Sequence, residues 1–140
     1  MQFSMGGKYM RTIKFRGKDC ANEWVYGDLI HKRHDPGEVY IQDENGLGSD
    51  VPLETVGQFT GLLDKDGKEI YEGDIIMSDR NRDVVRHEVF YNEDEASFCA
   101  ALNGRRDSFF GTCSIRKEWI ERCEKRVVGN IHDNPELLER

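Results

Sequence analysis

A tight turn that leads at once into apolar strands constrains the fold of this chain more than any other feature. Val56–Met77 reads VGQFTGLLDKDGKEIYEGDIIM. Its Asp-Lys-Asp-Gly-Lys segment has turn chemistry, because aspartate favours early turn positions and Gly67 accepts a positive φ without a Cβ clash. Gly73 then precedes the apolar run Ile75–Met77. The stretch predicts paired strands, and we expect Gly73 to adopt a conformation or a close packing that a side chain would disturb.

Most of the remaining chain alternates between short β-prone stretches and turn residues. Fourteen glycines against three prolines favour turns and bulges over long helices. Turn signals about every eight to twelve residues are typical of a small barrel or sandwich. We expect a loop at 45–50 and strands at 12–16, 24–31, 38–42, 57–63, 70–71, 74–78, 84–91, 96–102 and 126–131.

Two segments have helical patterns. Apolar residues recur at helical spacing within Ser114–Cys123, with Ser114 as the expected N-cap. Asn134 and Pro135 suit the N-cap and first position of a terminal helix. The sequence therefore predicts a mainly β fold (β-dominated α+β). We expect a small SH3-like barrel or meander of short strands, a short helix near 114–123 and a short C-terminal helix.

Six motifs, taken in chain order, carry a family resemblance: Met10–Lys18, Trp24–Leu29, Gly57–Leu62, Tyr71–Ile75, Gly129–His132 and Asn134–Leu138. Together they resemble the YopX-like family of phage and prophage proteins. The resemblance implies one domain over residues 10–140. It leaves 1–9 as an N-terminal extension, either native and disordered or left over from cloning. The hallmark positions, which we expect to be structural, are Gly57, Gly61, Gly67, Glu72, Gly73, Asp74, Gly129, Asn130, Asn134 and Pro135.

Charge is distributed unevenly along the chain. The formal net charge is −7, of which residues 1–34 contribute +4, residues 35–79 contribute −10 and residues 80–140 contribute −1. A protein that binds nucleic acid over its whole surface should be basic, and this one is not. A local basic face remains open, as does head-to-tail contact between unlike patches of neighbouring subunits. We therefore expect a homo-oligomer.

Several cations have aromatic neighbours in the sequence, as in a groove that tracks phosphates and stacks bases. The simpler interpretation is a solvated charged face, and any nucleic-acid binding should be weak and non-specific. The candidate contacts are Lys14, Arg16, Lys18, Arg80, Arg82, Arg105 and Arg106, with Phe15 or Phe109 available for stacking.

Other chemistries find little support in the sequence. His31, His34 and Asp35 form an H-x-x-H-D string, but two intervening cations would repel a metal ion, so we interpret it as a solvated turn. Glu72 and Asp74 suit a turn better than acid–base catalysis. Asp64–Glu69 lacks the later ligands of a calcium loop. We expect no metal, cofactor or catalytic residue.

The cysteines and the hydropathy pattern indicate the compartment. Cys20, Cys99, Cys113 and Cys123 lack disulfide-framework or zinc spacing, which favours reduced thiols. No stretch is apolar enough for a membrane span, and no signal peptide is recognisable. These features predict a cytoplasmic protein without a membrane partner, and the family resemblance implies that the cytoplasm is that of the host of a phage or prophage.

The sequence therefore favours a non-enzymatic binding or assembly module, with a phage or host protein as its partner. A nucleic-acid-binding accessory factor in phage replication or regulation is one alternative. An enzyme whose site is built from dispersed residues is the other.

Overall fold

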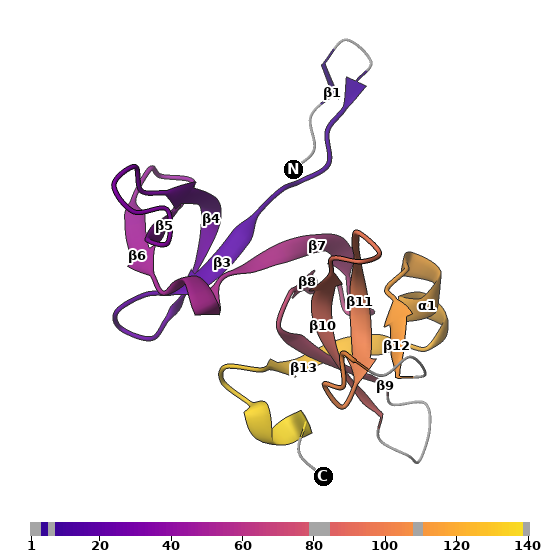
Figure 1. Cartoon of the computed structure of the whole chain (residues 1–140). Coiled ribbons are helices and arrows are strands. Elements are labelled where there is room, and N and C mark those ends of the chain that lie inside the picture. Colours follow the sequence, from indigo (N-terminus) through magenta and orange to yellow (C-terminus); the bar gives the residue numbers. More distant parts are fainter. Residues whose placement is uncertain (1–3, 6–7, 79–84, 108–110, 139–140) are drawn as a thin grey trace. The chain divides into compact units, whose positions relative to one another are not determined.

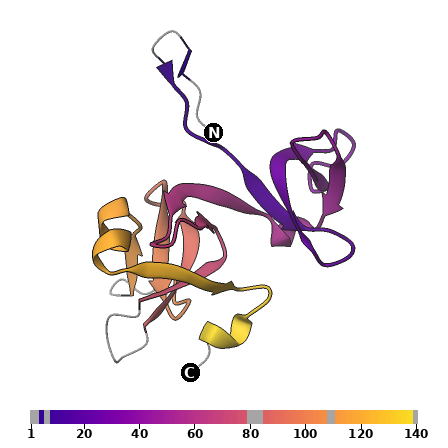
Figure 2. The ribbon, with the colours of Figure 1, turned by 180° about the vertical axis from the view of Figure 1, so that it is seen from behind.

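The computed structural model describes residues 4–5, 8–78, 85–107 and 111–138. These residues form two compact units, Met1–Gly61 and Leu62–Arg140 (Figures 1 and 2). The prediction of one domain at 10–140 with an extension at 1–9 stays a prediction. The part of that extension that the structure describes contains two short paired strands, β1 (Ser4–Met5) and β2 (Lys8–Tyr9).

The first unit is built from an antiparallel sheet of short strands. Their order in the sheet is β6-β5-β4-β3-β7, and β7 continues into the second unit, where β8 follows it. A 3₁₀ helix, η1, joins β6 to β7. The elements are β3 (Phe15–Lys18), β4 (Trp24–His31), β5 (Val39–Gln42), β6 (Gly48–Val51), η1 (Leu53–Thr55) and β7 (Gly57–Leu63).

The alternation of these strands places one set of side chains in a small core. Val39, Ile41 and Val51 are buried there, and residues 39 and 51 are direct partners across the β5–β6 pair. Phe15, Val25, Leu29 and Val56 pack against them. Full burial of an aliphatic side chain contributes about 1.5–3 kcal/mol each, so this cluster is a main source of stability for the unit.

The second unit contains an antiparallel sheet in the order β12-β11-β10-β9-β13. Both ribbon views show β10 and β11 side by side, with α1 beside the sheet (Figures 1 and 2). The elements are β8 (Glu69–Tyr71), β9 (Asp74–Ser78), β10 (Arg86–Asn92), β11 (Ser97–Leu102), β12 (Thr112–Ser114), α1 (Lys117–Arg122), β13 (Lys125–Asn130) and the 3₁₀ helix η2 (Pro135–Leu138).

This unit has a larger core of its own. Ile120 is the one buried residue of α1, and through it the helix packs on the sheet. Leu62, Phe98, Trp119 and Val127 cover the edges of this cluster. The buried members are Ile70, Ile76, Val89, Ala100, Ile115 and Ile120.

The prediction of a mainly β fold with one short helix near 114–123 and a short C-terminal helix is confirmed. Three details were wrong. The strand expected at 12–16 is β3, which runs from Phe15 to Lys18. Gly48–Val51 forms β6 where we expected loop, and α1 begins at Lys117 rather than after Ser114, which belongs to β12. The pairings among the described residues give open sheets, so closure into an SH3-like barrel stays a prediction. No helix in the described part of the chain is long and apolar enough to cross a membrane.

Candidate functional site

The first unit carries a solvent-open hollow of about 570 Å³. Three separate segments of the unit form it: the β3–β4 turn, the loop between β4 and β5, and the end of β6 with η1. The residues that line it are Asp19, Cys20, Lys32, Gly37, Glu38, Val39, Asp50, Val51, Pro52, Leu53 and Glu54.

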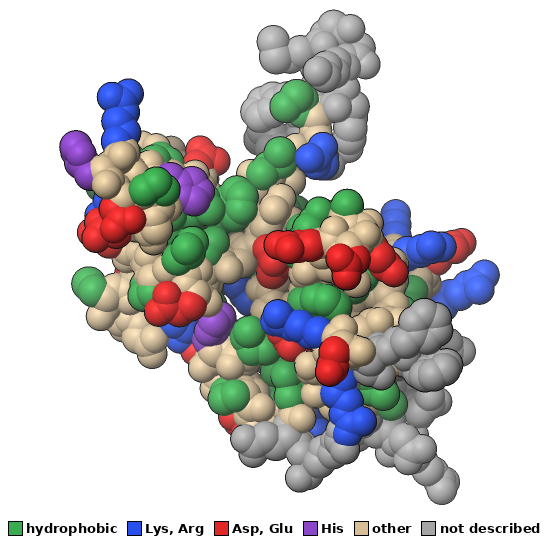
Figure 3. All heavy atoms as spheres, viewed as in Figure 1, with side chains coloured by type: hydrophobic (Ala, Val, Ile, Leu, Met, Phe, Trp, Pro, Cys, Tyr) green, Lys and Arg blue, Asp and Glu red, His purple; other side chains and the backbone are tan. Residues whose placement is uncertain are grey.

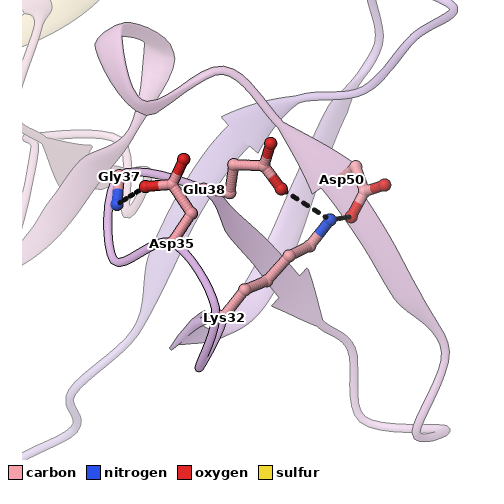
Figure 4. A network of polar contacts seen from close by, with 5 residues as sticks. All are labelled: Lys32, Asp35, Gly37, Glu38 and Asp50. Carbon is pink, nitrogen blue, oxygen red and sulfur yellow. Dashed lines mark hydrogen bonds and ion pairs between the residues drawn. The ribbon is translucent and has the colours of Figure 1, made fainter.

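Short polar turns hold two of these segments in place. In the β4–β5 loop, Asp35 Oδ1 accepts the N–H of Gly37 at 3.0 Å, and the Asp35 carbonyl accepts the N–H of Glu38 at 2.9 Å (Figure 4). The N–H of Lys32 donates to the Glu38 carbonyl at 2.9 Å and closes the loop. In the β3–β4 turn, Asp19 Oδ1 accepts two backbone N–H groups at 2.9 Å each. Aspartate at the start of a turn commonly bonds its own backbone two residues on.

Lys32 is the one cation among the lining residues, and it lies between carboxylates. Its Nζ is 2.9 Å from Asp50 Oδ1 and 3.7 Å from Glu38 Oε2, and Figure 4 shows it pointing between the two. The hydrogen bond to Asp50 raises the pKa of Lys32 above its ordinary value. Asp19 and Glu54 bring the number of lining carboxylates to four. Three formal negative charges are therefore in excess.

Apolar surface lies beside these charges. Val39 and Val51, which are almost fully buried, belong to the lining, as does Leu53, whose residue surface is 46% exposed. No histidine lines the hollow. In the described part of the chain, no group of three or more His, Cys, Asp and Glu residues could hold a metal ion. The hollow therefore presents apolar side chains and carboxylates side by side.

A second cluster of titratable groups lies in the second unit. The rings of His87 and Trp119 pack edge-on with 5.4 Å between their centres, and Lys125 Nζ is 4.9 Å from the centre of the Trp119 ring. Burial, and then the charge of Lys125, lowers the pKa of His87 to about 4. Burial likewise lowers the pKa of Lys125 and raises that of Cys113. His87 is therefore neutral at pH 7.

The structure divides the predicted nucleic-acid contacts between the two units. In the first unit, Arg16 and Lys18 are buried, and their charged ends lie 4.4 and 5.1 Å from the centre of the Trp24 ring. Lys14 Nζ is 5.7 Å from the centre of the Phe59 ring. These three cations thus lie in β3 or directly before it, and each is close to an aromatic ring, as in sites that bind and stack bases.

The remaining candidate cations belong to the second unit. Arg105 and Arg106 are exposed, and Arg106 pairs with the buried carboxylate of Glu88 and lies 5.3 Å from the Phe90 ring centre. Figure 3 shows acidic side chains beside basic ones on the face in view. Arg80, Arg82 and Phe109 lie outside the described residues.

The first group of hallmark residues forms a turn between β8 and β9. Asp74 is 2% exposed, and its Oδ2 accepts the N–H of Tyr71 at 2.7 Å, which closes the turn around Glu72 and Gly73. The interpretation of this segment as a turn is confirmed. Earlier in the chain, Gly57 and Gly61 lie in β7, and Gly67 lies in the β7–β8 turn with a φ of +85°.

The second hallmark group joins β13 to η2. Asn130 Oδ1 accepts the N–H groups of His132 and Asp133 at 3.0 and 2.9 Å. Asn134 Oδ1 in turn accepts the N–H of Asn130 at 3.2 Å, and Pro135 begins η2 as expected. A Cβ at Gly129 would lie 2.6 Å from Asn134 Oδ1, so this close approach needs a glycine. These hallmark residues shape the backbone.

The model of the YopX protein family matches residues 14–139. The chain belongs to the YopX family. The match spans both compact units, and it confirms the resemblance that the motifs carried. The YopX chain is also similar to a solved structure, protein EF1440 from Enterococcus faecalis, at 26% identity and a TM-score of 0.60. The similarity covers 93% of this chain and 100% of that one. No curated protein is similar enough to count as a match.

The hollow was not predicted from the sequence. The only signal for it is the excess of acidic residues over 35–79, which supplies Glu38, Asp50 and Glu54. Lys32 and Asp19 come from the basic N-terminal part of the chain, so sequence spacing could not group them with the others. In addition, Asp50 belongs to the strand that we expected to be loop.

Proposed function

We propose that this YopX protein is a phage- or prophage-derived, non-enzymatic binding module of the host cytoplasm, and that its first unit contacts a protein partner through the hollow. The hollow itself carries the proposal. It is open to solvent, three loops and strand ends frame it, and it presents apolar and charged side chains together. Binding sites of this kind combine apolar lining with a few placed polar groups.

The order of elements supports an SH3-like arrangement of the first unit. Four strands connected by short turns are followed by a 3₁₀ helix and a fifth strand, β7, which pairs with β3. Small barrels of this class host many unrelated functions, so the fold alone does not select one. The lining residues favour binding over catalysis, because Cys20 is the one thiol among them and no histidine base accompanies it.

Photo-cross-linking in a lysogenic bacterial host tests the proposal. Leu53 in the hollow and Leu47 outside it are both exposed leucines of the first unit, and each would be replaced by p-benzoylphenylalanine. We expect a discrete protein adduct from position 53 and none from position 47. An adduct with the mass of two chains would identify a second copy as the partner. Equal labelling from both positions, or none from position 53, would contradict the proposal.

The nucleic-acid alternative rests on a smaller observation, the pairing of Lys14, Arg16 and Lys18 with aromatic rings. Because Arg16 and Lys18 are buried on Trp24, their reach toward a phosphate is restricted. Binding of a single-stranded oligonucleotide should be weak and should fade between about 50 and about 200 mM salt. Fluorescence anisotropy decides this, and tight binding that salt does not affect would favour the alternative over the protein-binding module.

A further inference from the structure

The ammonium group of Lys32 lies beside two carboxylates of the hollow, those of Asp50 and Glu38. Both are within ion-pair distance, while the Lys32 stem starts from the end of β4. The hollow thus already holds one alkylammonium group, at a point where two carboxylates converge (Figure 4). This intramolecular occupant shows which chemistry the hollow accepts.

Lys32 does not neutralise the hollow. Its single charge contacts two of the four lining carboxylates, Asp50 and Glu38, and Glu54 forms no ion pair with any residue that the structure describes. The apolar lining residues Val51, Pro52 and Leu53 lie next to these acids in the sequence and in the hollow. A lysine or arginine side chain is complementary to this lining. Its apolar stem matches the apolar residues, and its positively charged end matches the carboxylates.

The contacts of Lys32 are also easily exchanged. The side chains of Asp50 and Glu38 are 77% and 63% exposed, and that of Lys32 is 34% exposed. Exposed ion pairs of this kind contribute little to stability, since water and salt screen them. An incoming cation can therefore replace Lys32 without disrupting the fold.

We infer that the hollow binds a lysine or arginine side chain of a protein partner, and that Lys32 fills the same place until that side chain displaces it. This inference rests on the proposed function and specifies its ligand. Lys32 then acts as a built-in competitor that lowers the affinity for cationic segments. Asp50 and Glu38 are the residues that determine specificity.

A titration with a minimal probe tests this inference. Nα-acetylargininamide, whose only charge is the guanidinium, would be added to the ¹⁵N-labelled protein at low ionic strength, and amide shifts would be followed by NMR. We expect shifts at residues 19–20, 37–39, 50–51 and 53–54. Nα-acetylnorleucinamide, which has an apolar stem without the charged side-chain end, should produce none of them. Shifts spread over both units, or equal shifts with the two probes, would overturn the inference.

Two charge-matched variants isolate the role of Lys32. K32Q removes the competitor, whereas K117Q removes an exposed cation of α1 in the second unit. We expect K32Q to tighten the binding of Nα-acetylargininamide about threefold to tenfold, which corresponds to about 0.7–1.4 kcal/mol. K117Q should leave the affinity unchanged, and D50N should weaken it. Equal affinity of K32Q and the unmodified protein would overturn the competitor role.

The two proposals can fail separately. A cross-link from position 53 together with no probe binding would leave the protein-binding module standing and remove the cationic ligand. Probe binding at the hollow without any cross-link would support the ligand chemistry and contradict the proposed cellular partner.

Discussion

At Gly73 a single backbone conformation joins the β8–β9 turn to β10 and to the residue after β13. Its φ is +89°, which a side chain disfavours, and its N–H donates to the Val89 carbonyl at 2.8 Å. Its own carbonyl accepts the N–H of Ile131, also at 2.8 Å. The turn therefore cannot relax to an ordinary φ without the loss of bonds to β10 and to the residue after β13. The expectation that a side chain would disturb Gly73 is confirmed.

Gly73→Ala should lower the free energy of unfolding by about 1 kcal/mol or more, because alanine strains this region of φ. Gly37→Ala is the control, since Gly37 is exposed and its φ lies outside that region. Urea denaturation of the three proteins measures the difference. Equal midpoints for the two variants would contradict the argument.

Asp64 shows how far the sequence predicts a residue's role. Its Oδ1 accepts the N–H groups of Asp66 and Lys68 at 2.8 and 2.9 Å, which is the turn chemistry that the sequence indicates. Its Oδ2 also accepts the N–H of Val127 in β13 at 2.9 Å. That third bond spans 63 residues, and no local pattern contains it. Turn chemistry is local and predictable, whereas a buried carboxylate's distant partner is not.

Asp64→Ala should destabilise the protein by about 2–4 kcal/mol, because it leaves three backbone N–H groups without their charged acceptor. Asp66→Ala is the matched control in the same turn. Asp66 is exposed, and its role in the bond to Asp64 uses only its backbone. Thermal and urea unfolding should separate the two variants clearly. A similar small loss for both would show that the Asp64 carboxylate, including its bond to β13, contributes little.

At the scale of elements, the sequence located most strands with apolar alternation and missed β6 and β12, which lack it. Gly48–Val51 contains glycine, serine and aspartate, which are not β-prone, so we expected loop. The strand forms because its backbone pairs with that of β5, with Val39 opposite Val51 and Ile41 opposite Ser49. Ser114 was lost from the helix for the same reason, since it pairs with Cys99 across β11 and β12. Pairing with a neighbouring strand overrode local propensity at both places.

Three elements meet at His87, namely β10, α1 and β13. The described residues offer no hydrogen-bond partner to its buried Nδ1, and burial and Lys125 keep the ring neutral. The unfolded chain takes up a proton near the ordinary pKa of 6.5, but the folded chain does so only near 4. The folded state is therefore favoured fully above about pH 6.5, and it loses stability as the pH falls from 6.5 towards 4.

His87→Phe should reduce this acid sensitivity, since phenylalanine keeps the edge-on contact with Trp119 and cannot be protonated. Because the ring is partly exposed, we expect the difference between pH 7 and pH 4 to shrink by about 1–2 kcal/mol. His34→Gln, at an exposed histidine, is the control substitution. Denaturant unfolding across this range measures the slopes, and identical slopes for His87→Phe and the unmodified protein would contradict the assignment.

At the scale of the whole molecule, the charge asymmetry of the chain reappears in space. The acidic segment supplies most of the carboxylates around the hollow, while the N-terminal segment supplies Lys32 and the cations on Trp24. Lys32 of the N-terminal segment thus pairs with Glu38 and Asp50 of the acidic segment inside the first unit. The charge asymmetry can be read directly from the sequence, but the position of each charge in space depends on strand register and on loop closure. The charges of the segments therefore suggested complementary patches, but they could not locate the hollow.

The last prediction is that the protein self-associates through this asymmetry. β6 and β12 are edge strands of the described sheets, and small β domains often cover such edges in oligomers. Light scattering at micromolar concentration and physiological salt should give a mass above the 16.2 kDa of one chain. At about 1 M salt, where screening shortens to about 3 Å, the mass should fall towards the monomer. A monomer at every salt concentration would remove self-association, and an oligomer that salt does not affect would contradict its electrostatic origin.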